Sequence, residues 1–100
     1  MNKIYSLLGL CQRAGKLISG EVGSQQAIQK GNAKLLLLAE DASANTKKKF
    51  QNSAVYYHIP LYTIGTKEAI GAALGKDSRS VLVITEEGFA KSIVQKINQA

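Results

Sequence analysis

The chain has few of the residues that most often carry covalent or metal chemistry. It contains one cysteine, Cys11, and one histidine, His58, among 100 residues. A single cysteine excludes an intramolecular disulfide, and a reducing compartment is its simplest environment. Cys11 belongs to the apolar stripe of a predicted helix, so a core role is expected for it rather than a nucleophilic pair with His58. Metal-ligand spacings are also missing, and we expect neither a metal nor a cofactor.

Long apolar runs and phosphate-binding loops are missing as well. No segment approaches the roughly 20 apolar residues that a membrane-spanning helix needs, so the cytoplasm is the expected location. The stretch GEVGSQQ, from Gly20, has neither the lysine nor the glycine spacing of a Walker motif. Glu40 and Asp41, at the end of a predicted strand, could bind Mg²⁺ with a substrate phosphate. Such a pair more often closes a strand and caps the next turn.

Positive charge is what the chain does have. Thirteen basic and seven acidic side chains give a net charge of +6 and a sequence pI near 9.6. Clustered lysine and arginine gain free energy by releasing counterions from phosphates, which favours a polyanionic partner. Lys47, Lys48 and Lys49 stand in the first turns of a predicted helix, where the helix dipole disfavours cations. Either a ligand requires them there or they form a solvated face.

Segments with helical periodicity alternate with short apolar runs of strand length. The predicted strands cover 16–18, 35–39, 61–64 and 81–84. The predicted helices run from the amino terminus to Gly15, from about Glu21 to Lys30, from a cap at Ser43 or Asn45 to His58, from Thr66 to Gly75, and from Thr85 onward. This alternation predicts an α/β fold, a three-layer α/β/α sandwich around a central four-stranded sheet, in a single domain over residues 1–100. The strand order stays open.

The pattern also predicts the ends and inward faces of individual helices. The second helix has the weakest propensity, because it contains Gly23 and its amino end has no clear signal. The expected inward face of the third helix consists of Phe50, Ala54 and Tyr57. Thr85 is the expected cap of the final helix, with Glu86 in the first turn, where the helix dipole favours anions.

Several stretches together resemble a known family. GEVGSQQAIQKGNAKLLLLAEDAS from Gly20, IPLYTIGTKEAIGAALG from Ile59 and SRSVLVI from Ser78 are similar to the ribosomal-protein L7Ae superfamily of kink-turn RNA binders. RAGKL at Arg13 and AEDASANTKKK at Ala39 are most similar to its small bacterial members of the YlxQ type. The resemblance covers almost the whole chain. It implies the three-layer α/β/α fold and binding of a sharply bent RNA loop that contains tandem G·A pairs.

The same resemblance implies where RNA binds. Members of the superfamily place the amino end of the second helix in the groove at the kink, and they cover a flipped-out nucleotide with the loop before the last strand. The implied RNA-binding residues are Gly20, Glu21, Val22, Gly23, Gln26, Lys30, Lys67, Lys76, Arg79, Ser80 and Leu82. Backbone N–H groups from 20–23 would approach the RNA, basic side chains would neutralise phosphates, and Val81 or Leu82 would pack beneath an unstacked base.

This chain departs from the family at the second helix. Val22 stands where asparagine is usual, Gly23 where glutamate is usual and Gln26 where lysine is usual, and Ser80 replaces a proline. Asparagine and glutamate discriminate base edges, whereas Val22 and Gly23 offer only apolar contact and backbone groups. Lys30 keeps the basic residue that closes the helix.

The expected function is that of a non-catalytic, monomeric RNA-binding protein. Its expected partners are structured RNA of the kink-turn type and the ribosome, with no membrane. Two alternatives stay open. A protein-interaction module is favoured by the replaced side chains and disfavoured by the net charge of +6. A small enzyme acting on a phosphorylated compound would use Glu40 and Asp41.

Overall fold

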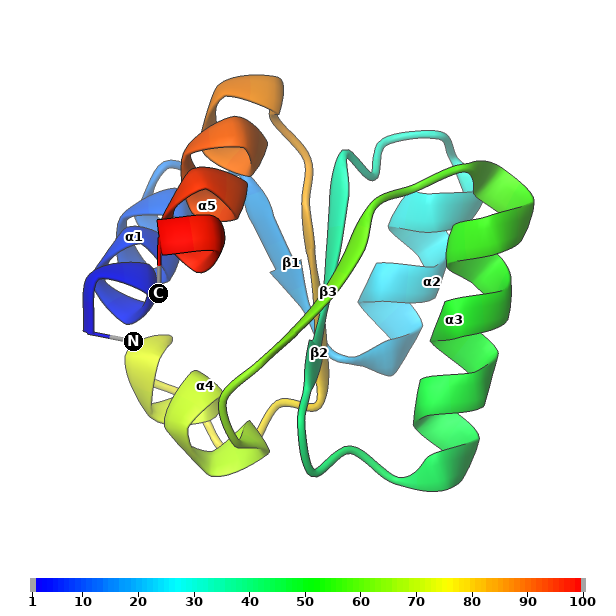
Figure 1. Ribbon diagram of the computed structural model, residues 1–100, viewed down its shortest axis with the longest axis horizontal. Helices are drawn as coiled ribbons and strands as arrows, with labels where there is room; N and C mark the ends of the chain where they lie inside the picture. Colours follow the sequence, from blue (N-terminus) through cyan, green and yellow to red (C-terminus); the bar gives the residue numbers. More distant parts are fainter. Residues whose placement is uncertain (1, 100) are drawn as a thin grey trace.

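A computed structural model describes residues 2–99 and confirms the predicted alternation of helices and strands (Figure 1). The two terminal residues of the expected domain, 1 and 100, lie outside the described part. In chain order the elements are α1 (Asn2–Arg13), β1 (Leu17–Ser19), α2 (Glu21–Gln29), β2 (Leu35–Ala39), α3 (Ala44–Tyr57), β3 (Leu61–Ile64), α4 (Lys67–Ala73), β4 (Val81–Ile84) and α5 (Glu87–Gln99). In this part of the chain, no helix has the length and apolar character to cross a bilayer.

The sheet has the strand order β1-β4-β2-β3, which the sequence did not disclose. Strands β2 and β3 are parallel, whereas β4 runs antiparallel to both β1 and β2. Consequently β1, β2 and β3 all end, and β4 begins, at the same edge of the sheet. We call this edge, with the turns that follow the three strands and precede β4, the 20/79 edge, after Gly20 and Arg79 that lie on it.

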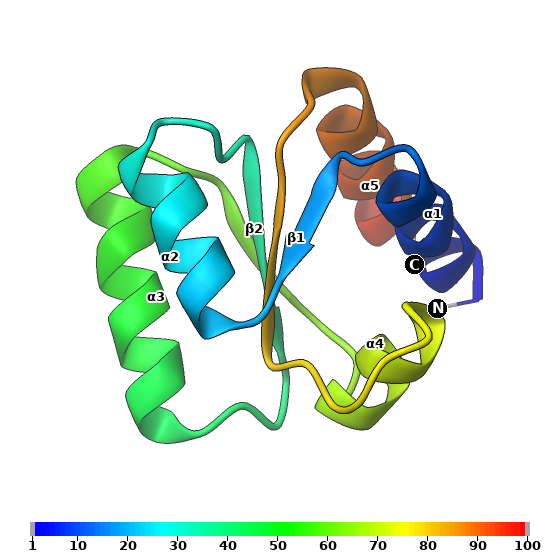
Figure 2. The same ribbon diagram turned by 180° about the vertical axis from the view of Figure 1, so that it is seen from behind.

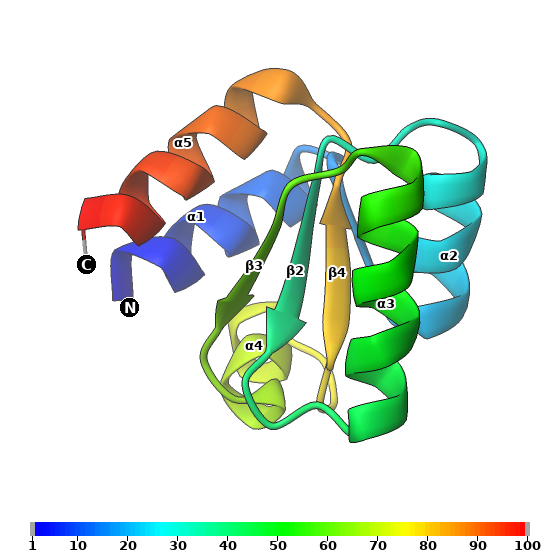
Figure 3. The ribbon, with the colours of Figure 1, turned by 45° about the vertical axis from the view of Figure 1, so that its right-hand side comes forward.

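Helices cover both faces of the sheet, as the sandwich prediction requires (Figures 1 and 2). On one face, α1, α4 and α5 enclose a core that includes Leu8, Leu37 and Ile93. On the other face, α2 and α3 pack over a second core around Ile28 and Phe50. Strand β2 lies between them with every residue buried, because its leucines point alternately into one core and the other. Figure 3 shows the sheet between its two helical layers.

The core role expected for Cys11 is confirmed, since its side chain is fully buried. Burial raises the pKa of the Cys11 thiol to about 11, and the negative charge of Glu86 adds to the shift. The thiol group lies 3.4 Å from the backbone oxygen of Lys16, to which it donates a hydrogen bond. The residue is therefore an inert part of the core at neutral pH.

Two local predictions were wrong. The cap of α5 is Glu86 rather than Thr85, because the Glu86 carboxylate accepts hydrogen bonds from the N–H groups of Phe89 at 2.8 Å and Gly88 at 2.9 Å. Those two bonds lower the pKa of Glu86. Tyr57 was expected to face inward, yet it is 39% exposed, since it is the last residue of α3 and lies beyond the buried residues of that helix.

Candidate nucleic-acid interface

Three helices begin at the 20/79 edge: α2 after β1, α3 after β2 and α4 after β3 (lower part of Figure 1). The first N–H groups of any helix have no partner within the helix, and they carry the positive end of its dipole. Whether the chain itself supplies acceptors to those groups decides which helix start can bind an external anion.

The start of α3 is closed by its own side chains. Ser43, one of the two predicted caps, accepts a hydrogen bond from the N–H of Thr46 at 3.2 Å. Next to this cap, the side chain of Lys47 holds the preceding turn, because Lys47 Nζ donates to the backbone oxygen of Glu40 at 2.8 Å. Lys48 and Lys49 are exposed, and Lys49 also has a contact within the protein, because its Nζ lies 5.4 Å from the centre of the Phe50 ring.

The start of α4 is closed twice. The predicted cap, Thr66, accepts a hydrogen bond from the N–H of Ala69 at 3.1 Å. Asp41 accepts a second one from the N–H of Lys67 at 2.8 Å. This bond gives Asp41 the capping role that the sequence had offered as the alternative to metal binding.

The start of α2 is open. Its N-cap is Gly20, with φ 93° and ψ 161°, and no side chain caps it. The first helical bond runs from the N–H of Ser24 to the carbonyl of Gly20 at 3.0 Å. The preceding N–H groups, of residues 21–23, thus face outward without a side-chain acceptor from the cap position. Val22 is 73% exposed, and Gln26, one turn further on, is exposed on the same side.

An arginine lies beside this open helix start. Arg79 Nε donates to Ser19 Oγ at 3.2 Å, directly before Gly20. Its Nη1 donates to the backbone oxygens of residues 77 and 78 at 3.2 and 3.1 Å, which fixes the loop before β4. The N–H of Arg79 donates to the backbone oxygen of Lys67 at 3.0 Å. The fold therefore joins Gly20, Lys67 and Arg79, which are distant in sequence, at one edge. Ser80 is there too, its oxygen accepting from Ala39 at 2.8 Å.

A polar contact that the sequence did not reveal holds α2 and α3 together. Thr46 Oγ1 donates to Glu21 Oε2 at 3.2 Å and accepts from Ser43 Oγ at 2.9 Å. Thr46, at the centre of this network, is 7% exposed, whereas Glu21 and Ser43 are exposed. The only signal available in the sequence was a threonine at the inward-facing position one turn before Phe50.

Three of the predicted site residues lie elsewhere or point inward, and a fourth, Gly23, has a packing role. Lys30 is the C-cap of α2, at the far end of that helix, about 13 Å along its axis at 1.5 Å per residue. Lys76 is exposed and follows the carboxyl end of α4. Leu82 is fully buried within the sheet, as is Val81, so neither presents a surface to a base. At Gly23, an added Cβ would stand 2.9 Å from Ile18 Cγ2, so close packing of α2 against β1 explains this glycine.

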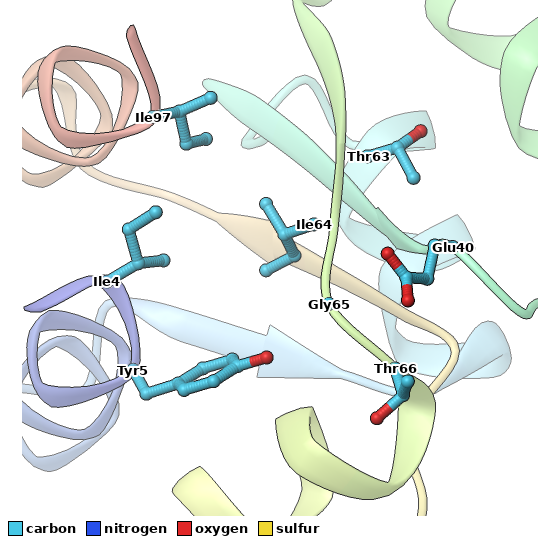
Figure 4. A pocket seen from close by; sticks show the side chains of 8 residues that line it. All are labelled: Ile4, Tyr5, Glu40, Thr63, Ile64, Gly65, Thr66 and Ile97. Carbon is cyan, nitrogen blue, oxygen red and sulfur yellow. The ribbon is translucent and has the colours of Figure 1, made fainter. Parts of the chain in front are cut away.

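The carboxylate of Glu40 faces a separate hollow at the 20/79 edge (Figure 4). The hollow has a volume of about 440 Å³, and its remaining lining comes from Ile4, Tyr5, Thr63, Ile64, Gly65, Thr66 and Ile97. Tyr5 turns its hydroxyl group toward the side on which Glu40 lies, whereas the Thr66 hydroxyl points away from Glu40 and accepts the hydrogen bond from Ala69 at the start of α4. Within residues 2–99 no three acidic, histidine or cysteine side chains gather closely enough to hold a metal ion.

The fold and the site together define a small α/β/α protein. One edge of its sheet exposes backbone amides, a guanidinium group and an ammonium group, a combination that suits an anionic ligand.

The chain belongs to the ribosomal protein L7Ae/L30e/S12e/Gadd45 family, which matches residues 2–94. The "RNA-binding protein YlxQ" of Bacillus subtilis (strain 168) is 38% identical over 94 residues, 94% of each chain. That of Enterococcus faecium is 40% identical over 95 residues, which cover 95% of this chain and 91% of the relative.

A solved structure has the same fold. It is described as a protein with unknown function from Bacillus halodurans C, and it superposes with a TM-score of 0.91 at 36% sequence identity. The superposition covers 96% of this chain and 97% of that chain. Together these relatives confirm the resemblance inferred from the sequence, including its bacterial YlxQ-type branch, and they confirm the fold class.

Proposed function

We propose that this protein is a non-catalytic RNA-binding protein that recognises a kink-turn or a similarly bent structured RNA, in association with the ribosome. The observation that carries the proposal is the open start of α2, where Gly20 supplies no side-chain cap. Phosphate oxygens and base acceptors can bind the free N–H groups of residues 21–23. Membership of a family described by its ribosomal proteins, and relatives named as RNA-binding, support this choice of anion.

The cations beside α2 fit a phosphate backbone on the same edge. Arg79 uses Nε and Nη1 to hold the loop before β4, which leaves its Nη2 amino group for a ligand. Lys67 is exposed and is tied to Arg79 through the backbone. In this arrangement the amides of α2 read the bent groove through the backbone, while Lys67 and Arg79 supply salt-dependent affinity.

The first test is a titration against a kink-turn RNA and against the same RNA with its G·A pairs replaced, at two salt concentrations. Tight binding that is lost on replacement is the expected result, because backbone amides at a rigid helix start require the bent groove. Equal binding to both RNAs, with a steep salt dependence, would reduce the proposal to non-specific electrostatic attraction.

The second test removes the two cations. The double variant Lys67→Ala, Arg79→Ala should bind the kink-turn more weakly, and its salt dependence should fall by about two counterions' worth. The variant Lys3→Ala, Lys91→Ala removes the same charge from α1 and α5 and is the matched control. An unchanged salt slope in the first variant, or an equal change in the control, would remove Lys67 and Arg79 from the interface.

One observation favours a protein-interaction module as the second candidate. Val22, at the position where the family usually has asparagine, is 73% exposed, and an apolar side chain on a helix start can contact a protein as readily as a base. Complexes purified from cells distinguish the two functions. A partner that remains bound after nuclease treatment and is released by Val22→Asp favours the protein module.

A further inference from the structure

Helix α3 has an outer face that neither the core nor the 20/79 edge uses. Phe50 and Ala54 bury the inner face, whereas Val55 is 77% exposed, Tyr56 is 76% exposed and Tyr57 is 39% exposed. Single exposed apolar side chains are ordinary on protein surfaces, but here three follow one another at one helix end. A face with this much uncovered aromatic surface is suited to a ligand that is flat and partly apolar.

The two tyrosine rings form a braced platform. Their centroids are 4.9 Å apart and their planes meet at 75°, an edge-to-face contact. In such a contact one ring turns only its edge to its neighbour, so its own faces stay uncovered by that neighbour. The backbone is fixed just beyond the pair, because His58 takes the left-handed conformation with φ 57° and ends the helix.

The same helix carries only positive charge. Its sequence, ANTKKKFQNSAVYY, contains three lysines and no acidic residue. Lys47 donates to the backbone of Glu40, whereas Lys48 and Lys49 are exposed, with Lys49 Nζ 5.4 Å from the centre of the Phe50 ring. Lys49, Asn52 and Tyr56 recur at intervals of three and four residues, so one stripe of the helix presents a cation, an amide and an aromatic ring in turn.

The position of this stripe connects it to the candidate interface. Helix α3 starts at the 20/79 edge, next to α2, and Ser53 donates to Gln25 at 3.5 Å further along the two helices. From Lys49 to Tyr56 the stripe spans about 10 Å at 1.5 Å per residue. A nucleic-acid strand that leaves the edge can therefore follow α3, passing the lysines first and the tyrosines last (Figure 3).

We propose that the outer face of α3 binds a single-stranded RNA segment flanking the bent element, with Lys48 and Lys49 against phosphates and Tyr56 stacked on a base. The inference rests on the proposed function for the placing of the bent element. Cations followed by aromatic rings along one helix suit a single strand, which presents phosphates to the first and unpaired bases to the second, and stacking accepts any base.

The test compares a kink-turn RNA with the same RNA carrying a single-stranded extension of about six nucleotides, a length within the usual range of single-strand sites. The wild-type protein should bind the extended RNA about tenfold more tightly. Tyr56→Ala should lose that tenfold gain and leave binding of the unextended RNA unchanged, whereas Tyr56→Phe keeps the ring and should retain the gain. Lys48→Gln, Lys49→Gln should lower the gain and its salt dependence.

Two further measurements make the result specific. The chain has no tryptophan, so the emission of its four tyrosines is readable, and stacking on Tyr56 should quench part of it when the extended RNA binds. Leu10, 49% exposed on α1, gives the control variant Leu10→Ala, which should behave as wild type. An equal affinity of wild type for both RNAs overturns the inference, as does a gain that survives in Tyr56→Ala.

The extension alone, as a free oligonucleotide, separates this inference from the proposed function. If the kink-turn is bound but the extension adds nothing, the α3 site is wrong and the α2 interface stands. If the kink-turn is not recognised but the oligonucleotide binds and Tyr56→Ala weakens it, the α3 site stands and the α2 assignment fails. A protein partner that needs Tyr56 in the absence of RNA overturns the single-strand assignment.

Discussion

Helices α2 and α4 start at the same edge of one sheet and differ in how their first N–H groups are satisfied. At α4 the chain supplies two acceptors, Thr66 and Asp41. At α2 it supplies none from the cap position, which Gly20 occupies. An N-cap side chain stabilises a helix by about a few tenths of a kcal/mol relative to glycine, so the helix start at Gly20 lacks a small stabilisation that a bound ligand can supply. The capped start of α4 stabilises the fold, whereas the uncapped start of α2 is where we propose that the RNA binds.

The largest expected effect on stability comes from the loop after α4, which contains Asp77 and folds back onto that helix. An added Cβ at Gly71 would overlap the carbonyl group of Asp77, a backbone neighbour that cannot move without the whole loop. Gly71→Ala should therefore lower the free energy of unfolding by about 3 kcal/mol and displace Arg79 from the edge. Gly9→Ala, whose Cβ would stand 3.4 Å from the Ala73 oxygen, is the control and should cost much less in urea denaturation.

Removing the two caps of α4 should have the next largest effect on stability. Asp41→Ala with Thr66→Ala removes both acceptors of α4 and should lower the free energy of unfolding by about 2 kcal/mol. The variant Thr63→Ala, Asp77→Ala loses the same residue types at exposed positions and should cost little. Thermal unfolding of the two double variants measures the difference. Equal melting temperatures would mean that the caps of α4 add no stability over water.

A proline at the first position of α2 tests the open end. Glu21→Pro removes one free N–H without breaking a helical bond, and the extended ψ of Gly20 accommodates a following proline. Glu21→Ala loses the same carboxylate and its contact with Thr46 but keeps the N–H. Glu21→Pro should bind kink-turn RNA about fivefold more weakly than Glu21→Ala, about 1 kcal/mol. Equal affinities would exclude this amide from the RNA contact.

The smallest effect is expected at α5, which closes its start with Glu86. Hydrogen bonds from Phe89 and Gly88 lower the pKa of this carboxyl, so its ionised form stabilises the folded state above the ordinary pKa of 4.5. That contribution is lost as the pH falls through the lowered folded-state pKa. The stability difference between wild type and Glu86→Gln should therefore shrink on acidification below pH 4.5, and a constant difference in urea titrations would contradict this capping role.

The order and type of the elements could be predicted from the sequence because they depend on local pattern. The leucine run of β2, the caps Ser43 and Thr66 and the helix end at His58 all follow from neighbouring residues. Choices that depend on how far a side chain reaches in space could not. Glu86 replaced Thr85 as a cap because the side chain of Glu86 reaches two N–H groups at once, which periodicity does not reveal.

The candidate site was predictable only in part for the same reason. The family pattern located Gly20, Lys67 and Arg79, but it also included Lys30 and Leu82, which the fold places at the far end of α2 and inside the sheet. Contacts between residues far apart in the chain, such as Thr46 with Glu21, depend on the strand order β1-β4-β2-β3. One sequence does not contain that order in any local form.

The buried thiol of Cys11 can report how often the folded protein transiently opens. With a pKa of about 11 and full burial, the thiol reacts with an alkylating reagent only in molecules that have transiently opened. The alkylation rate under native conditions thus measures the population of open molecules. An RNA that binds only the folded state must slow the reaction by the factor 1 + [RNA]/Kd, so affinity can be read from chemistry in a core far from the bound surface.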